Sequence, residues 1–66
     1  MKVTKDTIIG DILDFNAHAA APLFMESGMH CLGCPSARSE SVGEACGIHN
    51  VNADELVNKL NNVLNQ

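Results

Sequence analysis

Two cysteines separated by two residues carry the strongest chemical signal in this sequence. They lie in the segment Cys31-Leu32-Gly33-Cys34-Pro35, in which Gly33 lowers the steric cost of a tight turn. Such a turn brings the two sulfurs within bonding range of each other. Thiols at this spacing can close a disulfide or bind one metal ion. The segment therefore predicts thiol chemistry of one of these two kinds.

The neighbouring residues indicate how the thiols are activated. Proline is favoured at the first position of a helix, so Pro35 predicts that Cys34 is a helix N-cap. The helix dipole and the unpaired N–H groups lower the pKa of a thiol placed there. His30 directly precedes Cys31, where it can stabilise a thiolate or carry a proton; an incidental loop position is an equally weighted alternative. We expect Cys31, Cys34 and His30 to form a redox site, with the attacking cysteine left open.

A third cysteine, Cys46, lies on the apolar face of a predicted helix, which favours a buried and unreactive thiol. A metal site is the alternative. Zinc would be held by the ligand set Cys31, Cys34, Cys46 and His49, although this spacing only loosely resembles common zinc patterns. The cysteines can also hold an iron–sulfur cluster, with a fourth ligand from His30, His49 or a second subunit.

The size, composition and charge of the chain exclude several classes of function. Its 66 residues predict one domain, 1–66, and the two Phe with no Trp or Tyr predict an aliphatic core without a sizeable substrate cavity. No Ser-His-Asp set, carboxylate pair or glycine-rich phosphate loop can be assembled, so an enzyme with its own substrate pocket is the least favoured class. The net charge of −4 argues against nucleic acid or an anionic membrane as a partner. A protein or a small molecule is expected instead.

The apolar residues are spread along the chain in short runs. The beginning of the sequence lacks the apolar run of a signal peptide, and no stretch approaches a transmembrane helix in length. These patterns predict a cytoplasmic protein. In a reducing compartment, three cysteines are not expected to form a structural disulfide framework, which leaves redox chemistry, metal binding or burial as their roles.

The hydrophobic periodicity predicts an all-α fold of four to five short helices. An optional edge strand over Lys2 to Lys5 precedes a first helix that is capped by Asp6 or Thr7. A second helix is expected over 17–25, with Pro22 in its first turn or at a kink. Gly28 is expected to end that helix in the left-handed conformation, with Met29 available for an apolar contact.

The second half of the chain carries clearer helix signals. After a short helical turn over 35–38, Ser41 and Glu44 match a capping box. The helix that follows is expected to place Val42, Ala45, Cys46 and His49 along one side. In the last helix, Asn52 and Glu55 form a similar cap, and Val51 can pack onto Leu56. An apolar stripe then runs through Leu56, Val57, Leu60, Val63 and Leu64.

Three blocks of the sequence together resemble a known family. They are residues 2–13 (KVTKDTIIGDIL), residues 26–35 (ESGMHCLGCP) and residues 44–46 (EAC). With these blocks, nearly the whole chain resembles the hybrid-cluster-protein-associated redox disulfide family, formerly a domain of unknown function. It departs from the usual pattern at residues 16–19 (NAHA), where a Pro-Glu helix start is more common. This departure concerns the second helix and not the thiols.

The resemblance implies a compact α-helical cytoplasmic domain of an anaerobic or facultative microbe. It also implies a dithiol–disulfide role near nitrogen-oxide or iron–sulfur stress chemistry, and similarity to the N-terminal module of iron–sulfur cluster repair proteins. Together with the residues, it predicts a thiol redox module that cycles Cys31 and Cys34 with a redox partner protein and needs no cofactor. A metal-binding or partner-docking module is the alternative, and a homodimer stays open.

Overall fold

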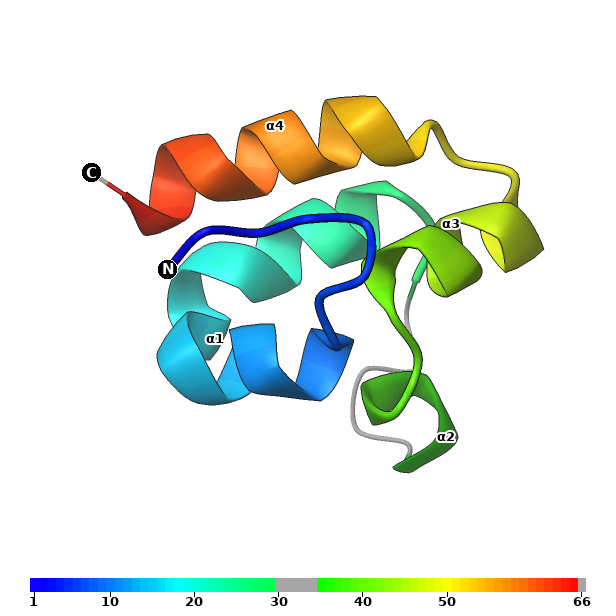
Figure 1. The fold of residues 1–66 in the computed structure, drawn as a ribbon, viewed down its shortest axis with the longest axis horizontal. Helices are drawn as coiled ribbons and strands as arrows, with labels where there is room; N and C mark the ends of the chain where they lie inside the picture. The colour runs from blue at the N-terminus through cyan, green and yellow to red at the C-terminus, as the bar shows by residue number, and fades with distance from the viewer. Residues whose placement is uncertain (30–34, 66) are drawn as a thin grey trace.

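The structure, a computed structural model, describes residues 1–29 and 35–65. This part of the chain contains α1 (Ile9–Glu26), α2 (Pro35–Arg38), α3 (Val42–His49) and α4 (Ala53–Leu64), and no strand (Figure 1). The predicted all-α fold is confirmed. Helix α4 packs along α1, and the extended N-terminal segment crosses beside them, while α2 lies near the start of α1.

The start of α1 differs from the prediction. Neither Asp6 nor Thr7 caps the helix; its N-cap is Ile8, which makes no side-chain capping bond. The Thr7 hydroxyl instead accepts a hydrogen bond from the Thr4 N–H at 2.8 Å. The Thr7 carbonyl accepts one from the Val42 N–H at 2.9 Å. These bonds stabilise the turn over residues 4–7 and connect it to the start of α3. Helix α1 begins after this turn, at Ile9.

A break at Asn16 divides α1 into two helical segments. The backbone of Asn16 is non-helical, with φ of −163° and ψ of 82°, and its side-chain oxygen accepts a hydrogen bond from the Ala19 N–H at 3.2 Å. An Asn side chain can compete with the helix for backbone donors in this way. Pro22 is exposed and lies beyond the first turn of the second segment, so the predicted first-turn position is wrong; the non-helical residue inside α1 is Asn16.

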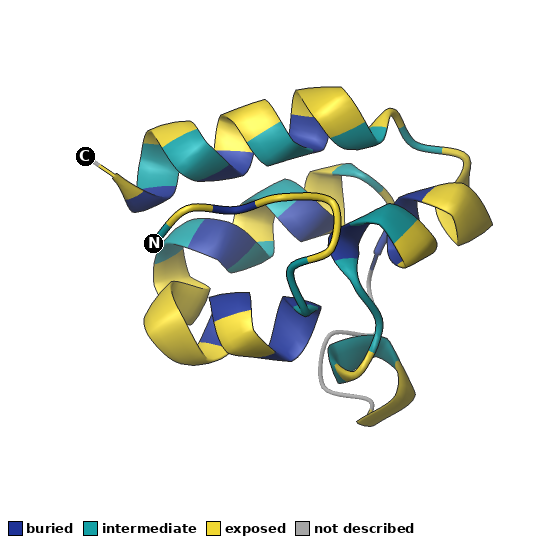
Figure 2. Cartoon of the chain, in the orientation of Figure 1, coloured by how far each residue is buried: buried dark blue, intermediate teal, exposed yellow. Residues whose placement is uncertain are grey.

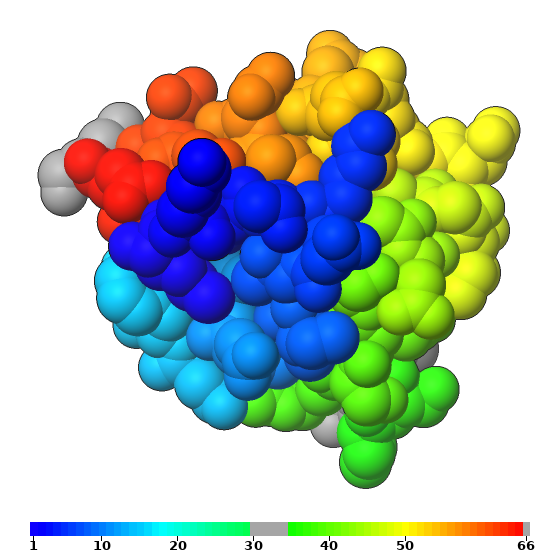
Figure 3. All heavy atoms as spheres, in the orientation of Figure 1, coloured from blue at the N-terminus to red at the C-terminus, as the bar shows by residue number. Residues whose placement is uncertain are grey.

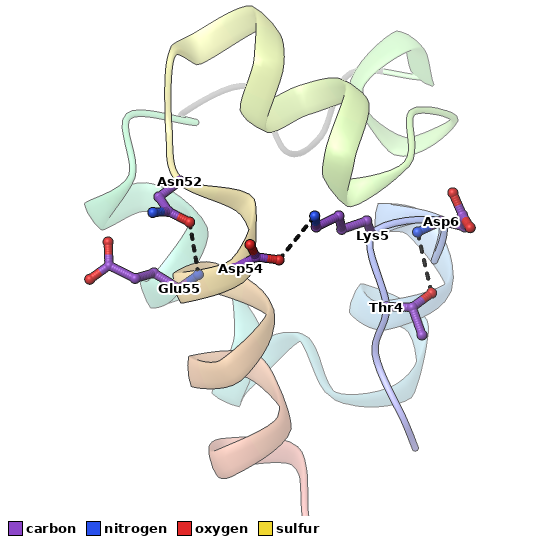
Figure 4. Close-up of polar contacts among 6 residues, drawn as sticks. All are labelled: Thr4, Lys5, Asp6, Asn52, Asp54 and Glu55. Carbon is purple, nitrogen blue, oxygen red and sulfur yellow. Dashed lines mark hydrogen bonds and ion pairs between the residues drawn. The ribbon is translucent and has the colours of Figure 1, made fainter.

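The two predicted caps in the second half of the chain are present. At α3, the Ser41 hydroxyl accepts a bond from the Glu44 N–H, and the Glu44 carboxylate accepts one from the Ser41 N–H, each at 3.1 Å. The pKa of the Glu44 carboxyl lies below its ordinary value, chiefly because the Ser41 N–H bonds to the carboxylate and to a smaller extent because the Ser41 side chain does. At α4, the Asn52 side-chain oxygen accepts a bond from the Glu55 N–H at 3.2 Å (Figure 4).

The N-terminal segment is held by side chains of α4. No strand forms over residues 2–5; instead, both backbone polar groups of Val3 bond to the Asn61 amide, with the Val3 N–H at 2.7 Å and the Val3 carbonyl at 3.0 Å. An exposed ion pair of 3.0 Å between Lys5 and Asp54 adds little to stability (Figure 4). Val3 is buried and anchors the segment in the core.

The buried side chains gather between α1, α3, α4 and the N-terminal segment (Figure 2). As predicted, the core is mainly aliphatic, and Phe24 is its largest side chain. Helix α4 contributes the predicted stripe, in which Leu56, Leu60 and Leu64 are buried and Val57 and Val63 pack half-buried against the core. Helix α3 contributes Val42, Ala45 and Cys46, but His49 is exposed. The predicted side of α3 is therefore buried from Val42 to Cys46, whereas His49, at the last residue of the helix, extends beyond the core.

Within residues 1–29 and 35–65, none of the helices combines the length and the apolarity that crossing a membrane requires.

We predict that Leu60→Ala lowers the free energy of unfolding by about 2–4 kcal/mol, because Leu60 is 0% exposed and a cavity would replace it. So large a loss is a substantial part of the stability of a small domain. The control is Asn62→Ala, on the exposed side of α4, which should change stability by less than about 0.7 kcal/mol through helix propensity. Urea denaturation measures both. A loss for Leu60→Ala no larger than the control change would mean that α4 is not docked.

Candidate functional site

The candidate redox residues occupy the connection between α1 and α2. His30, Cys31 and Cys34 lie outside the residues that the structure describes. The described residues include both ends of this connection, Met29 and Pro35, together with Cys46 and His49 on α3. The described parts of the candidate site are therefore the two ends of the connection and Cys46 with His49.

The first end is fixed by the cap of α1. Gly28 has a φ of 92°, the left-handed conformation that was predicted for it. The Gly28 N–H bonds to the Met25 carbonyl at 3.0 Å, and the Met29 N–H reaches back to the Phe24 carbonyl, also at 3.0 Å. This pair of bonds is the Schellman motif. Met29 and Phe24 are both buried in the core, so the residue before His30 is held by packing as well as by hydrogen bonds.

The second end is the beginning of α2. Pro35 is the first residue of this helix, as predicted, and its carbonyl accepts a bond from the Ser39 N–H at 3.1 Å. Cys34 therefore directly precedes the first helical residue. Pro35 is itself exposed, so the chain leaves the cysteine segment at the surface.

Helix α2 is attached to α1 by one arginine. The Arg38 guanidinium Nη2 lies 2.6 Å from an Asp14 carboxylate oxygen and 3.4 Å from the Gly10 carbonyl oxygen. Beyond α2, the Ile9 N–H donates to the Glu40 carbonyl at 2.9 Å. These bonds connect the short α2 to the first two turns of α1, which is the longest helix described.

Gly10 allows this close approach. A Cβ atom at position 10 would lie 2.8 Å from the Arg38 carbonyl oxygen, which is closer than real Cβ atoms come to a backbone oxygen. Any larger residue would therefore displace α2. In the sequence, Gly10 is only a residue of low helix propensity within the first helix. Its packing role was missed because the sequence carries no signal that brings Arg38 against it.

The third cysteine lies away from solvent. Cys46 is a free thiol that is 1% exposed, and burial raises its pKa. The predicted buried position is confirmed. His49 is exposed at the last residue of α3, so the two side chains lie in different environments. In the described part of the chain, no group of three or more His, Cys, Asp or Glu side chains is arranged to hold a metal ion.

We predict that Gly10→Ala destabilises the protein by about 1–3 kcal/mol, because the added methyl group collides with the Arg38 carbonyl. The matched control is Gly47→Ala in α3, where nothing lies within 4 Å of an added Cβ. That change should stabilise the protein by up to about 1 kcal/mol, since alanine has the higher helix propensity. Denaturant titration should give opposite signs, and amide NMR shifts over 36–39 should move in the first variant alone. A change of stability in the same direction for both variants would rule out the close contact between position 10 and the Arg38 carbonyl.

The geometry can be compared with known proteins. Residues 3–57 match the family model described as "Domain of unknown function (DUF1858)". The NMR solution structure of a protein from Clostridium thermocellum is 52% identical and superposes with a TM-score of 0.80, covering 94% of this chain and 87% of that one. No curated protein matches. The match over most of the chain means that this protein belongs to the domain family of unknown function DUF1858.

Proposed function

We propose that the protein is a thiol redox module in which Cys31 and Cys34 cycle between dithiol and disulfide with a partner protein. The observation that best supports this is the different burial of Cys46 and His49. Cys46 is in the core, whereas His49, three residues later, is exposed. A four-ligand metal site needs both side chains at one point, whereas a dithiol switch needs neither of them.

The burial of Cys46 supports the same choice. A metal ligand must be a thiolate, and burial disfavours the charged form of this thiol. A metal ion bound with high affinity can overcome such a cost, so the zinc or iron–sulfur alternative is kept as an outcome of the experiments below. It would use Cys31, Cys34 and Cys46 together with a histidine.

In the oxidising direction, the thiolate of one module cysteine attacks a sulfur of the partner's disulfide. The partner S–S bond breaks, a mixed disulfide forms, and the departing partner thiolate takes up a proton. The second module cysteine then loses its proton and attacks the module sulfur of the mixed disulfide. The module is left with a disulfide and the partner with two thiols, so two electrons and two protons have passed to the partner.

Within this proposal, His30 carries a proton or stabilises the thiolate of Cys31. The partner is a protein, in keeping with the net charge of −4, which disfavours nucleic acid and anionic membranes. We place the reaction in the cytoplasm, in nitrogen-oxide or iron–sulfur stress chemistry, on the strength of the sequence resemblance. The module works as a monomer or as a homodimer with the same pair of thiols.

We predict that the oxidised, metal-free protein contains a Cys31–Cys34 disulfide and an unmodified Cys46. In the reduced native protein, Cys46 should resist alkylation until denaturant is added, because its folded-state pKa lies above the ordinary value of 9.0. The raised pKa stabilises the folded state below pH 9.0, and this contribution is lost as the pH rises above that value. Peptide mapping without reductant gives the pairing. Cys46 recovered mainly in a disulfide would contradict the prediction.

We predict that the double variant Cys46→Ala with His49→Ala stays folded without metal and still cycles between dithiol and disulfide with a small disulfide donor. Cys46→Ala leaves a small cavity, so the folded fraction is measured by circular dichroism beside the redox behaviour. His49→Ala alone is the control for surface effects, and Cys31→Ser is the control that abolishes cycling. If the double variant loses stoichiometric zinc or iron together with its helical signal, the metal alternative replaces the redox proposal.

A further inference from the structure

An open depression lies beside the end of the cysteine segment. It has a volume of about 410 Å³ and is formed by the beginning of α1, with Ile8 and Gly10, and by the residues around α2, with Pro35 and Ser39. Figure 3 shows these two parts of the chain, blue and green, meeting on one face of the molecule. Pro35 directly follows Cys34 in the sequence, so the depression adjoins the end of the cysteine segment.

The lining of this α1–α2 depression is apolar with an acidic side. Ile8, Gly10 and Pro35 supply a mainly apolar surface, and Asp11 and Asp14 supply carboxylates. The Asp14 carboxylate is paired with Arg38 at 2.6 Å. Asp11 is exposed and has no ion-pair partner among the described residues. The depression therefore offers an apolar contact and one carboxylate that no described residue pairs with, which suits an apolar side chain next to a cation.

The walls of the depression are held at a fixed spacing before any ligand arrives. A Cβ atom added at Gly10 would lie 2.8 Å from the Arg38 carbonyl oxygen, so the Arg38 backbone lies directly against α1. The Arg38–Asp14 ion pair and the Ile9–Glu40 hydrogen bond of 2.9 Å join the same two walls. A preformed surface loses little conformational entropy when a ligand binds.

We propose that the α1–α2 depression receives an extended segment of the partner protein, whose apolar residue packs on Ile8 and Pro35 and whose lysine or arginine pairs with Asp11. This inference rests on the proposed thiol exchange and names the partner surface for it. In that exchange the attacking sulfur must touch a partner sulfur, so the partner residues that flank the disulfide lie next to the cysteine segment that ends before Pro35. The depression adjoins that position and complements a basic segment in charge.

The experiment compares reactive peptides of opposite charge. Two short peptides carry a cysteine as its pyridyl disulfide, flanked by leucine and by either lysine or glutamate. The pyridyl disulfide of mercaptoethanol is a neutral probe with the same leaving group. Rates of reaction with the reduced protein are measured by absorbance for the wild type, Asp11→Asn and Asp11→Lys. Glu55→Gln and Glu55→Lys are matched controls, because Asp11 and Glu55 are both exposed acidic residues in the first turn of a helix.

The lysine peptide should react faster than the glutamate peptide with the wild type. Asp11→Asn should lower this rate ratio about twofold to fivefold at low salt, the range of an exposed ion pair. Asp11→Lys should lower it further, and 1 M salt should remove the difference. The Glu55 variants should leave the ratio unchanged, and the neutral probe should react equally with all proteins. Equal effects of the Asp11 and Glu55 variants would overturn the proposal, because net charge alone would then explain the rates.

A second measurement separates this inference from the redox proposal. The lysine peptide with serine in place of its cysteine is titrated into isotope-labelled protein, and amide NMR shifts are followed. Binding at the depression predicts shifts of the Gly10, Asp11 and Ser39 amides in the wild type that weaken in Asp11→Lys. Shifts confined to other residues, or no shifts at all, would overturn the inference even if the thiols cycle. Failure of the neutral probe to oxidise Cys31 and Cys34 would instead overturn the redox proposal.

Discussion

The contact between Gly10 and the Arg38 backbone is the constraint on which the candidate site depends. Helix α2 has four residues, too few to be stable alone in water. Two contacts with α1 stabilise it. The Arg38 carbonyl packs against Gly10, which has no Cβ atom in the way, and the Arg38 guanidinium pairs with the Asp14 carboxylate. The position of Pro35, and with it the end of the cysteine segment, follows from this contact. The other end is set by Met29 in the core.

The N-terminal segment is joined to α3 and α4 by side-chain hydrogen bonds and by single backbone hydrogen bonds. The Asn61 amide bonds to both polar groups of Val3, and the Gly43 N–H donates to the Lys5 carbonyl at 2.8 Å. Each bond satisfies groups that would otherwise be partly buried without a partner, which costs more than the bond itself contributes. The N-terminal segment can therefore remain extended against the helices without pairing to a strand.

The three cysteines lie in two different parts of the chain. Cys46 packs in the core as a small apolar side chain, and burial opposes its ionisation. Cys31 and Cys34 lie in sequence between Met29, which is buried, and Pro35, which is exposed. This division is the basis for assigning exchange chemistry to the pair and a packing role to the third cysteine. The depression beside Pro35 is the surface that we propose the partner contacts during this exchange.

The sequence by itself determined the features that arise within a few residues. The Ser41–Glu44 capping box, the left-handed Gly28 and the leucine stripe of α4 were predicted correctly, because caps and amphipathic faces depend on neighbours within one or two turns. Features that need partners far along the chain were missed or wrong. The Asn61 amide holds Val3 where an edge strand was an option, and the Arg38 carbonyl lies against Gly10. Only the tertiary structure decided these, since no local pattern specifies which distant backbone a residue will contact.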